Sequence, residues 1–343
     1  MFNSFIREQF KDHKDLKILF RSKNQKIWDQ FLEKIKDAHF YYYSQELNYQ
    51  SLYQRELGFE DQDLSFIILN NNEILSIFGL SILRKKDSYF LGCNGKPVLS
   101  PIFRKQCSIQ MERLISEKCF DICEKIAGKL HIKKWHSNFF LFSQKENSEW
   151  IKICKKRNYN IFKTLEGFIK LTNKKTIDKK YLRRIKDNHW EIKNFLSINK
   201  KDWNLFKNLH LKVAGKKTRS DKTWESQFED LNNKRAFAIF LYDKNKKGSL
   251  VGGNIYRIEK NISIYAVGVN DRSYFPKSMS IYSFYHGIIE MLNKNIGWVS
   301  LGDIPSERDF NNPTSKEISI GNFKKKISTD IFEKFTIESR NLI

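Results

Sequence analysis

Hydrophobic and polar positions follow two patterns along the first half of the chain. Short runs rich in β-branched and aromatic residues predict strands at 63–70, 74–83, 88–92, 131–142 and 159–171, with a turn at 71–73. Apolar residues recur at helical spacing from Cys107 to Lys129, and a shorter helix is expected at 149–157. This order of strands and helices predicts a mixed α/β unit.

The second half repeats the same order, although the two halves share little sequence identity. Strands are expected at 236–242, 249–258, 262–269 and 297–301, and a helix follows Pro276 to about Leu292. We therefore predict the α/β class, with two tandem domains of mixed sheets at 1–175 and 176–343. The basic stretch from Asn173 to Lys193 joins them, either as a solvated linker helix or as one wall of a phosphate-binding groove.

Length and composition fit two globular domains. The chain has 343 residues, of which 40% are hydrophobic and 14% aromatic, and this is enough to build two cores. Global disorder is excluded. No apolar run reaches the length of a transmembrane helix, and the N-terminus shows no signal-peptide pattern, so we expect a cytoplasmic protein.

The net charge of +23 raises nucleic acid or an anionic membrane surface as a partner. Most of the basic residues are lysine, and the excess of Lys, Asn and Ile is also what a low-GC coding sequence places on a protein surface. Charge alone therefore leaves both interpretations open. The five cysteines and seven histidines show no zinc-ligand spacing, and Cys119 and Cys123 are expected to be small buried side chains, so no metal site is predicted.

Two segments of the second half are candidates for chemistry. The first runs from His210 through Gly215 and Arg219 to Trp224, where Ser220 or Asp221 would cap a helix. Backbone N–H groups at that helix start, beside Arg219, suit a phosphate or a carboxylate, and an ordinary capped helix with basic neighbours is the alternative.

The second segment combines the end of a strand with a later basic stretch. Leu301-Gly302-Asp303 ends a predicted strand, and Phe323-Lys324 would add an apolar surface and a cation for developing negative charge. No Walker A loop, dinucleotide fingerprint, nucleophile elbow or kinase motif is present.

These short motifs, in this order, resemble those of the Fem-type peptidyltransferases within the GNAT acyltransferase superfamily. The resemblance is best from His210 to Lys326 and is architectural before that. It implies two GNAT-like domains around a shared cleft, with the active cleft in the second, and transfer of an acyl or aminoacyl group to an amine of a cell-envelope or glycan precursor. It also implies that Phe323 and Lys324 lie near the reacting groups. Further substrate-binding candidates are Arg219, Trp224, Tyr256, Tyr265, Asp303 and His210.

The donor and the acceptor are less sharply indicated. The Gly-rich turn that usually binds acetyl-CoA is missing from 271–280, which favours aminoacyl-tRNA or another carrier over acyl-CoA as co-substrate. No bound cofactor is expected. The acceptor would be a nucleotide-sugar or lipid-linked glycan precursor, tRNA is a candidate partner, and peripheral membrane contact is compatible with the sequence. Between Trp224 and Ala236 there is no room for the long helical arm of some family members.

Two other functions stay open. One is a CoA-dependent sugar N-acetyltransferase, which differs in the donor. The other is a noncatalytic basic RNA-binding module, for which Tyr41-Tyr42-Tyr43 and Lys133-Lys134-Trp135 are the nearest aromatic and basic stretches, although both also suit internal packing.

Overall fold

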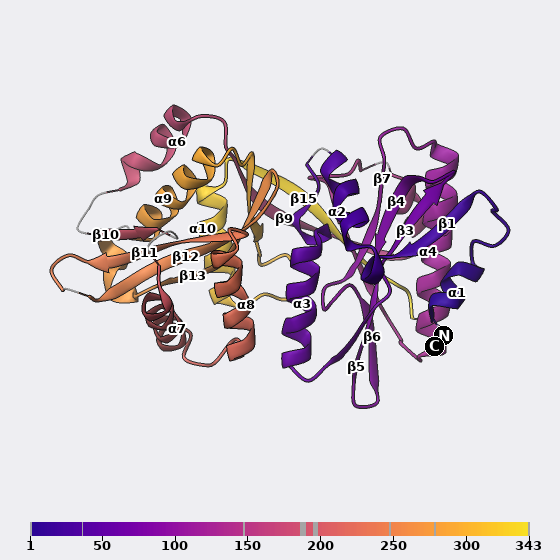
Figure 1. The fold of residues 1–343 in the computed structure, drawn as a ribbon, viewed down its shortest axis with the longest axis horizontal. Helices are drawn as coiled ribbons and strands as arrows, with labels where there is room; N and C mark the ends of the chain where they lie inside the picture. The colour runs from indigo at the N-terminus through magenta and orange to yellow at the C-terminus, as the bar shows by residue number, and fades with distance from the viewer. Residues whose placement is uncertain are drawn as a thin grey trace. The chain divides into compact units, whose positions relative to one another are not determined.

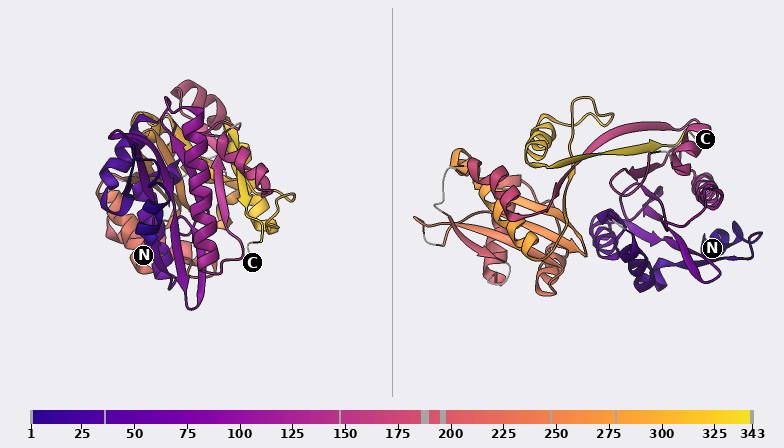
Figure 2. Two further views of the ribbon diagram at one scale, coloured as in Figure 1. Left: turned by 90° about the vertical axis from the view of Figure 1, so that its right-hand side faces the viewer. Right: turned by 90° about the horizontal axis from the view of Figure 1, so that it is seen from above.

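The computed structural model describes residues 2–35, 37–146, 148–185, 190–194, 198–246, 248–277 and 279–341. The chain forms two compact units (Figures 1 and 2). The first contains the chain up to Glu166, together with Ile304–Asn322 and the residues from Phe332 onward. The second contains Gly167–Asp303 and Phe323–Ile331.

The first unit is a mixed sheet with helices and a small additional sheet. Its main elements are β1 (Leu16–Phe20), α2 (Gln25–Lys34), α3 (Ser44–Glu56), β3 (Phe66–Asn70), β4 (Glu73–Gly79), β7 (Val98–Phe103), α4 (Ile109–Lys129), β8 (His136–Phe140), α5 (Glu149–Lys156) and β9 (Asn160–Lys170), preceded by α1 (Phe2–Glu8). The strand order is β1-β3-β4-β7-β8. The additional sheet has the order β2-β5-β6, from β2 (Glu60–Asp63), β5 (Ser81–Lys85) and β6 (Ser88–Gly92).

The second half of the chain has a corresponding succession of elements. They are α6 (Lys174–Tyr181), β10 (Trp190–Asn194), α7 (Lys200–Ala214), α8 (Asp221–Asn232), β11 (Ala236–Asp243), β12 (Leu250–Glu259), β13 (Ile262–Asn270), α9 (Met279–Asn293), β14 (Trp298–Asp303), α10 (Ser315–Ile327) and β15 (Asp330–Glu338). The strand order is β14-β13-β12-β11-β10. The predicted repeat is present, because β3-β4-β7-α4-β8-α5-β9 corresponds to β11-β12-β13-α9-β14-α10-β15. Its third strand in the first half is β7, however, and the strand expected there at 88–92 is β6 of the additional sheet.

Each repeat ends on a strand that pairs outside its own stretch of sequence. The last strand of the second repeat, β15, pairs with β8 through Phe335 and Phe139 and through Ile337 and Ser137. Strand β9, which ends the first repeat, is the neighbour of β14. The predicted division at residue 175 differs from the compact units for this reason: strand pairing returns the C-terminal residues to the first unit and carries the end of β9 into the second.

Two predicted strands of the first half are each divided by a corner. The expected strand at 63–70 is split between β2 and β3, and the expected strand at 74–83 is split between β4 and β5. The Ser65 hydroxyl donates to the Leu80 carbonyl and accepts from the Leu80 N–H, both at 3.1 Å. These bonds tie the two corners together, so each long apolar run serves two sheets.

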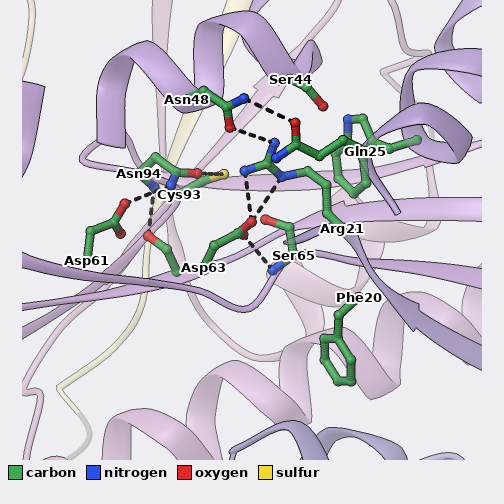
Figure 3. Close-up of polar contacts among 12 residues, drawn as sticks. Phe20, Arg21, Gln25, Ser44, Asn48, Asp61, Asp63, Ser65, Cys93 and Asn94 are labelled. Carbon is green, nitrogen blue, oxygen red and sulfur yellow. Dashed lines mark hydrogen bonds and ion pairs between the residues drawn. The ribbon is translucent and has the colours of Figure 1, made fainter. Parts of the chain in front are cut away.

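A buried arginine in the turn that directly follows β1 holds the same corner (Figure 3). Arg21 is 2% exposed, and its Nη2 and Nε donate to Asp63 Oδ2 at 2.8 and 3.1 Å, while Nη1 donates to Asn48 Oδ1 at 3.2 Å. Asp63 also accepts from the Ser65 N–H. A buried charge is costly without partners, so Arg21 and Asp63 must stay together. Their contact therefore fixes the end of β1 next to the corner between β2 and β3.

Strand β7 was not predicted, because Pro101 lies within it and proline is rare in central strands. It pairs with β4 through an irregular register between Ile77 and Gly79. The irregularity accommodates a residue that has no N–H to donate.

Helices cover both faces of the sheet portion β10–β14 in the second unit. Alternate residues of β11 point to opposite sides: Phe237 and Ile239 pack with residues of α6 and α9, whereas Ala238 and Phe240 pack with residues of α7 and α8. The same placement of these helices is visible in Figure 1. The two core clusters of this unit therefore lie on opposite faces of its sheet.

Candidate active site

Lys324 is held at the end of β14. Its Nζ donates to the backbone carbonyl of Asp303 at 2.9 Å. Gly302, which precedes Asp303, adopts φ +72°, and a Cβ added there would lie 3.6 Å from Lys324 Nζ. The predicted Gly-Asp strand end and the predicted Lys324 are thus brought together, and the positive φ is the conformation for which glycine is suited.

The strands β13 and β14 are paired only at their beginnings. They run parallel, and the pairing covers Ile262 to Ile264 against Trp298 to Ser300. Tyr265 follows the last pair on β13, and Gly302 and Asp303 follow it on β14. Carboxyl ends of parallel strands are where open α/β sheets bind ligands, so this position is the candidate site of the second unit.

Tyr265 belongs to a polar network that leads into the core. Its hydroxyl donates to Asn254 Oδ1 at 3.2 Å, and Asn254 Nδ2 donates to Ser283 Oγ at 3.0 Å and to Tyr256 Oη at 3.3 Å. Asn254 is 1% exposed. A Cβ on Gly268 would lie 1.5 Å from the Tyr265 hydroxyl, so a glycine is required there. Burial raises the pKa of Tyr265, which keeps its hydroxyl protonated as a donor.

Aromatic packing links this network with Phe323. The Phe284 ring on α9 lies 5.1 Å from Tyr265 and 6.3 Å from Phe323, both in edge-to-face contact. Tyr256 is fully buried and stacks on Phe237 at 4.9 Å. Of the predicted substrate-binding tyrosines, Tyr265 is therefore partly exposed beside the strand ends, whereas Tyr256 supports it from within.

His210, Arg219 and Trp224 form a second group at the junction of α7 and α8. Arg219 lies over the Trp224 ring at 5.3 Å, and its Nη1 is 3.4 Å from His210 Nε2. Burial, and then the charge of Arg219, lowers the pKa of His210 to about 4. The imidazole is therefore neutral at pH 7 and can accept from the guanidinium. The predicted cap is Ser220, which accepts from the Thr223 N–H at 3.1 Å.

The group around Lys324 and Tyr265 and the group of His210, Arg219 and Trp224 lie on opposite faces of the second unit's sheet. Trp224 is 5% exposed and packs with Phe206 in the core under α7 and α8, whereas Tyr256 and Phe323 pack on the face covered by α6 and α9. The structure thus joins Lys324, Asp303 and Phe323 with the tyrosine network, and it places His210, Arg219 and Trp224 in a separate cluster.

No protein-family model and no curated protein sequence matches the chain. Solved structures do. FemX superposes with a TM-score of 0.65 at 10% identity, over 91% of this chain and 95% of its own. A conserved protein of unknown function from Bacteroides thetaiotaomicron gives 0.54 at 11% identity, over 94% and 100%. A C-terminal domain assigned to lysylphosphatidylglycerol synthetase, from Agrobacterium fabrum, gives 0.50 at 11% identity, over 93% and 92%.

The chain has a Fem-type, GNAT-like fold. The resemblance inferred from the sequence and the prediction of two GNAT-like domains are confirmed at the level of the fold. Helix α8 ends at Asn232 and β11 begins at Ala236, so the second GNAT-like domain has no long helical arm at this point. Among the residues that the structure describes, no helix is long and apolar enough to span a membrane, and no group of three or more His, Cys, Asp or Glu could hold a metal ion.

In the first GNAT-like domain, side chains of the protein itself occupy the position that corresponds to the candidate site. Its last parallel pair is Leu99 with Asn138, so Ser100 corresponds to Tyr265 and Phe140 to Gly302. The Ser100 carbonyl accepts from the Tyr42 hydroxyl at 2.7 Å, and Gln144 Nε2 donates to the Pro101 carbonyl at 3.1 Å.

Packing completes this difference between the two domains. Phe140 stacks on His39 at 3.8 Å, where the second domain has a glycine beside a lysine. The strand ends of the first domain are therefore occupied by the chain's own side chains.

Sequence reasoning missed two features of these sites. Asn254 could have been found as a polar residue in an otherwise apolar strand. His39 and Glu166, each 1% exposed with Nε2 and Oε2 3.3 Å apart, are distant in sequence, and no spacing pattern reveals such a pair.

The cysteines, the basic stretch and the aromatic stretches considered in the sequence mostly have structural positions. Cys119 and Cys123 are fully buried. Part of the basic stretch forms α6, whose Ile177 and Tyr181 pack in the second core, and residues 186–189 of it lie outside the described residues. Tyr42, Tyr43 and Trp135 are at most 5% exposed, so they pack inside and offer no stacking surface to RNA.

Proposed function

We propose that the protein is an acyltransferase that moves an acyl or aminoacyl group onto an amine of a cell-envelope or glycan precursor. The observation that carries the proposal is the fixed position of the Lys324 ammonium beside Gly302 and Asp303, where the pairing of β13 and β14 ends. The Fem-type fold supports it, since FemX shares this architecture over almost the whole chain.

A cation at this place suits the chemistry of acyl transfer to an amine. The amine nitrogen attacks the carbonyl carbon of an ester or thioester, a C–N bond forms, and the C–O or C–S bond breaks. The proton lost by the amine goes to the leaving oxygen or sulfur. Negative charge develops first on the carbonyl oxygen and then on the leaving group, and a positioned ammonium stabilises it. Lys324 would supply that charge, while Phe323 and Tyr265 would shape the site around the donor and acceptor.

The first GNAT-like domain would support the second without binding an acyl donor of its own. Tyr42, Gln144 and the stacked pair of His39 and Phe140 occupy its equivalent strand ends. We place donor and acceptor chemistry in the second domain for this reason. Arg219, with His210 and Trp224, would bind a phosphate of one substrate on the other face of that domain's sheet.

The decisive experiment is a binding panel followed by a transfer assay. Acetyl-CoA, a charged tRNA mixture and several UDP-amino sugars are tested by thermal shift, since a ligand of the native state raises apparent stability. The hits are combined and amide formation is measured by mass spectrometry. Transfer that is lost in Lys324→Met supports the proposal, and transfer that persists in that variant removes Lys324 from the mechanism.

The same panel separates the two alternative functions. Binding of acetyl-CoA with acetyl transfer to an amino sugar would identify a CoA-dependent N-acetyltransferase that uses the same site. Binding of uncharged RNA without transfer of any acyl group would indicate a binding module. If the basic surface holds tRNA, affinity falls steeply between low and moderate salt, and a flat response favours the compositional origin of the net charge.

A further inference from the structure

The small sheet β2-β5-β6 of the first GNAT-like domain has two chemically different faces. In its pairing Leu83 lies opposite Phe90, and Arg84 lies opposite both Tyr89 and Glu60. Since side chains alternate along a strand, Leu83, Lys85 and Phe90 share one face, and Arg84, Tyr89 and Glu60 share the other.

The first of these faces carries exposed apolar side chains. Phe90 is 50% exposed, and Leu57, which precedes β2, is 48% exposed. The Phe59 ring contacts Phe90 edge to face at 6.0 Å. Lys85 Nζ lies 4.6 Å from the centre of the Phe59 ring and donates to the Leu57 carbonyl at 3.1 Å. We call Leu57, Phe59, Lys85 and Phe90 the hairpin patch.

Two lysines lie at the hairpin patch. Lys85 is within the patch, and the exposed Lys86 follows it at the turn with φ +54°, before the exposed Asp87. Glu60 belongs to the opposite face, where Arg84 lies 3.6 Å from it and over the Tyr89 ring at 5.7 Å. An acidic partner would therefore meet Lys85 and Lys86 at the patch. The neighbouring carboxylates are Asp87 at the tip, Glu56 before Leu57, and Asp61, which shares the face and accepts from the Asn94 amide.

We infer that the hairpin patch docks the protein on an anionic membrane surface. Half-exposed aromatic and aliphatic side chains beside lysines are the combination that inserts into the headgroup region, while the lysines attract acidic lipids. A single-stranded nucleic acid fits less well, because bases need open aromatic faces. In the patch Lys85 covers Phe59 and Leu57 offers no ring, so Phe90 is its one half-exposed ring, too few for successive bases to stack on. The inference does not depend on the proposed transfer reaction.

Vesicle cosedimentation tests this docking with the full-length protein. Binding to phosphatidylcholine vesicles is compared with binding to vesicles that also contain phosphatidylglycerol. We expect the wild type to bind the anionic vesicles and the double variant Leu57→Ser/Phe90→Ser to bind about tenfold more weakly, since each exchange removes apolar area from the contact. Lys85→Glu should weaken binding to anionic vesicles and leave binding to neutral vesicles unchanged.

The control is Ile109→Ser, at the start of α4, where an isoleucine is 61% exposed outside the patch. It should bind vesicles like the wild type. Equal vesicle binding by wild type and double variant, or absence of binding by the wild type, overturns the proposal. If the double variant loses oligonucleotide binding but keeps vesicle binding, the patch binds nucleic acid and the proposal is overturned. Transfer to a water-soluble acceptor should be the same in the double variant, which keeps this test separate from that of the proposed function.

Discussion

The Lys324 ammonium and the Asp303 carbonyl are joined by a 2.9 Å hydrogen bond across 21 positions of sequence. The bond fixes a cation from α10 at the last residue of β14. Gly302, with its positive φ, turns the strand end so that the carbonyl faces the lysine. A charge held in this way needs little rearrangement to stabilise a developing oxyanion, which is the condition for electrostatic catalysis.

Lys324→Met tests the role of this charge. We expect kcat to fall by about 10²–10³, the range found when one oxyanion-stabilising group is removed, while the melting temperature changes little. The matched control is Lys325→Met, which removes an exposed charge from the same helix. Steady-state rates of the two variants with one donor and acceptor pair make the comparison. Equal rates for wild type and Lys324→Met would exclude the lysine from the chemical step.

Asn254→Leu tests the buried network behind Tyr265. The change leaves the hydroxyls of Tyr265, Tyr256 and Ser283 without their shared amide, and we expect a loss of about 1–3 kcal/mol in the free energy of unfolding. Asn232→Leu, at an exposed position of α8, should change it by less than about 0.5 kcal/mol. Urea denaturation of both variants measures the difference. A stability of Asn254→Leu equal to that of the control would show that the network is dispensable.

The sequence was sufficient for the repeat but insufficient for the grouping of the site residues. Helix α4 begins after its Ser108 cap and β9 spans 160–170, close to prediction, because periodicity and caps are local signals. Pro101 concealed β7, since the register irregularity that tolerates it depends on the neighbouring strand. Trp224 and Tyr256 were grouped as substrate-binding residues, yet they face opposite sides of one sheet, and only the three-dimensional register assigns those sides.

His210 gives a prediction of pH dependence. Its pKa falls from the ordinary 6.5 to about 4 in the folded chain, so the unfolded chain binds more protons between these two values. The stability contributed by this position is therefore present above pH 6.5 and is lost as the pH falls toward 4. The melting temperature of the wild type should fall more over this range than that of His210→Gln, which cannot titrate.

The control for this titration is His131→Asn, an exchange at an exposed position with positive φ that asparagine tolerates. Its melting curve should follow the wild type at every pH. Parallel curves for wild type and His210→Gln would mean that His210 titrates normally in the folded chain. They would also contradict the close approach of Arg219 to a neutral imidazole.

The exchange of strands predicts that the C-terminus stabilises the first domain. Ile337 on β15 is fully buried in the first core, whereas Ile331 on the same strand is 40% exposed and belongs to the second unit. We expect Ile337→Ala to cost about 2–5 kcal/mol and Ile331→Ala much less. Hydrogen exchange resolves which part of the chain is affected. Protection should fall in β8, which pairs with β15, in β7, which pairs with β8, and in α4, which shares this core. All three lie some 200 residues earlier in the sequence. A loss confined to β11–β14 would instead place β15 in the folding unit of the second domain, as the sequence-based boundary at residue 175 supposed.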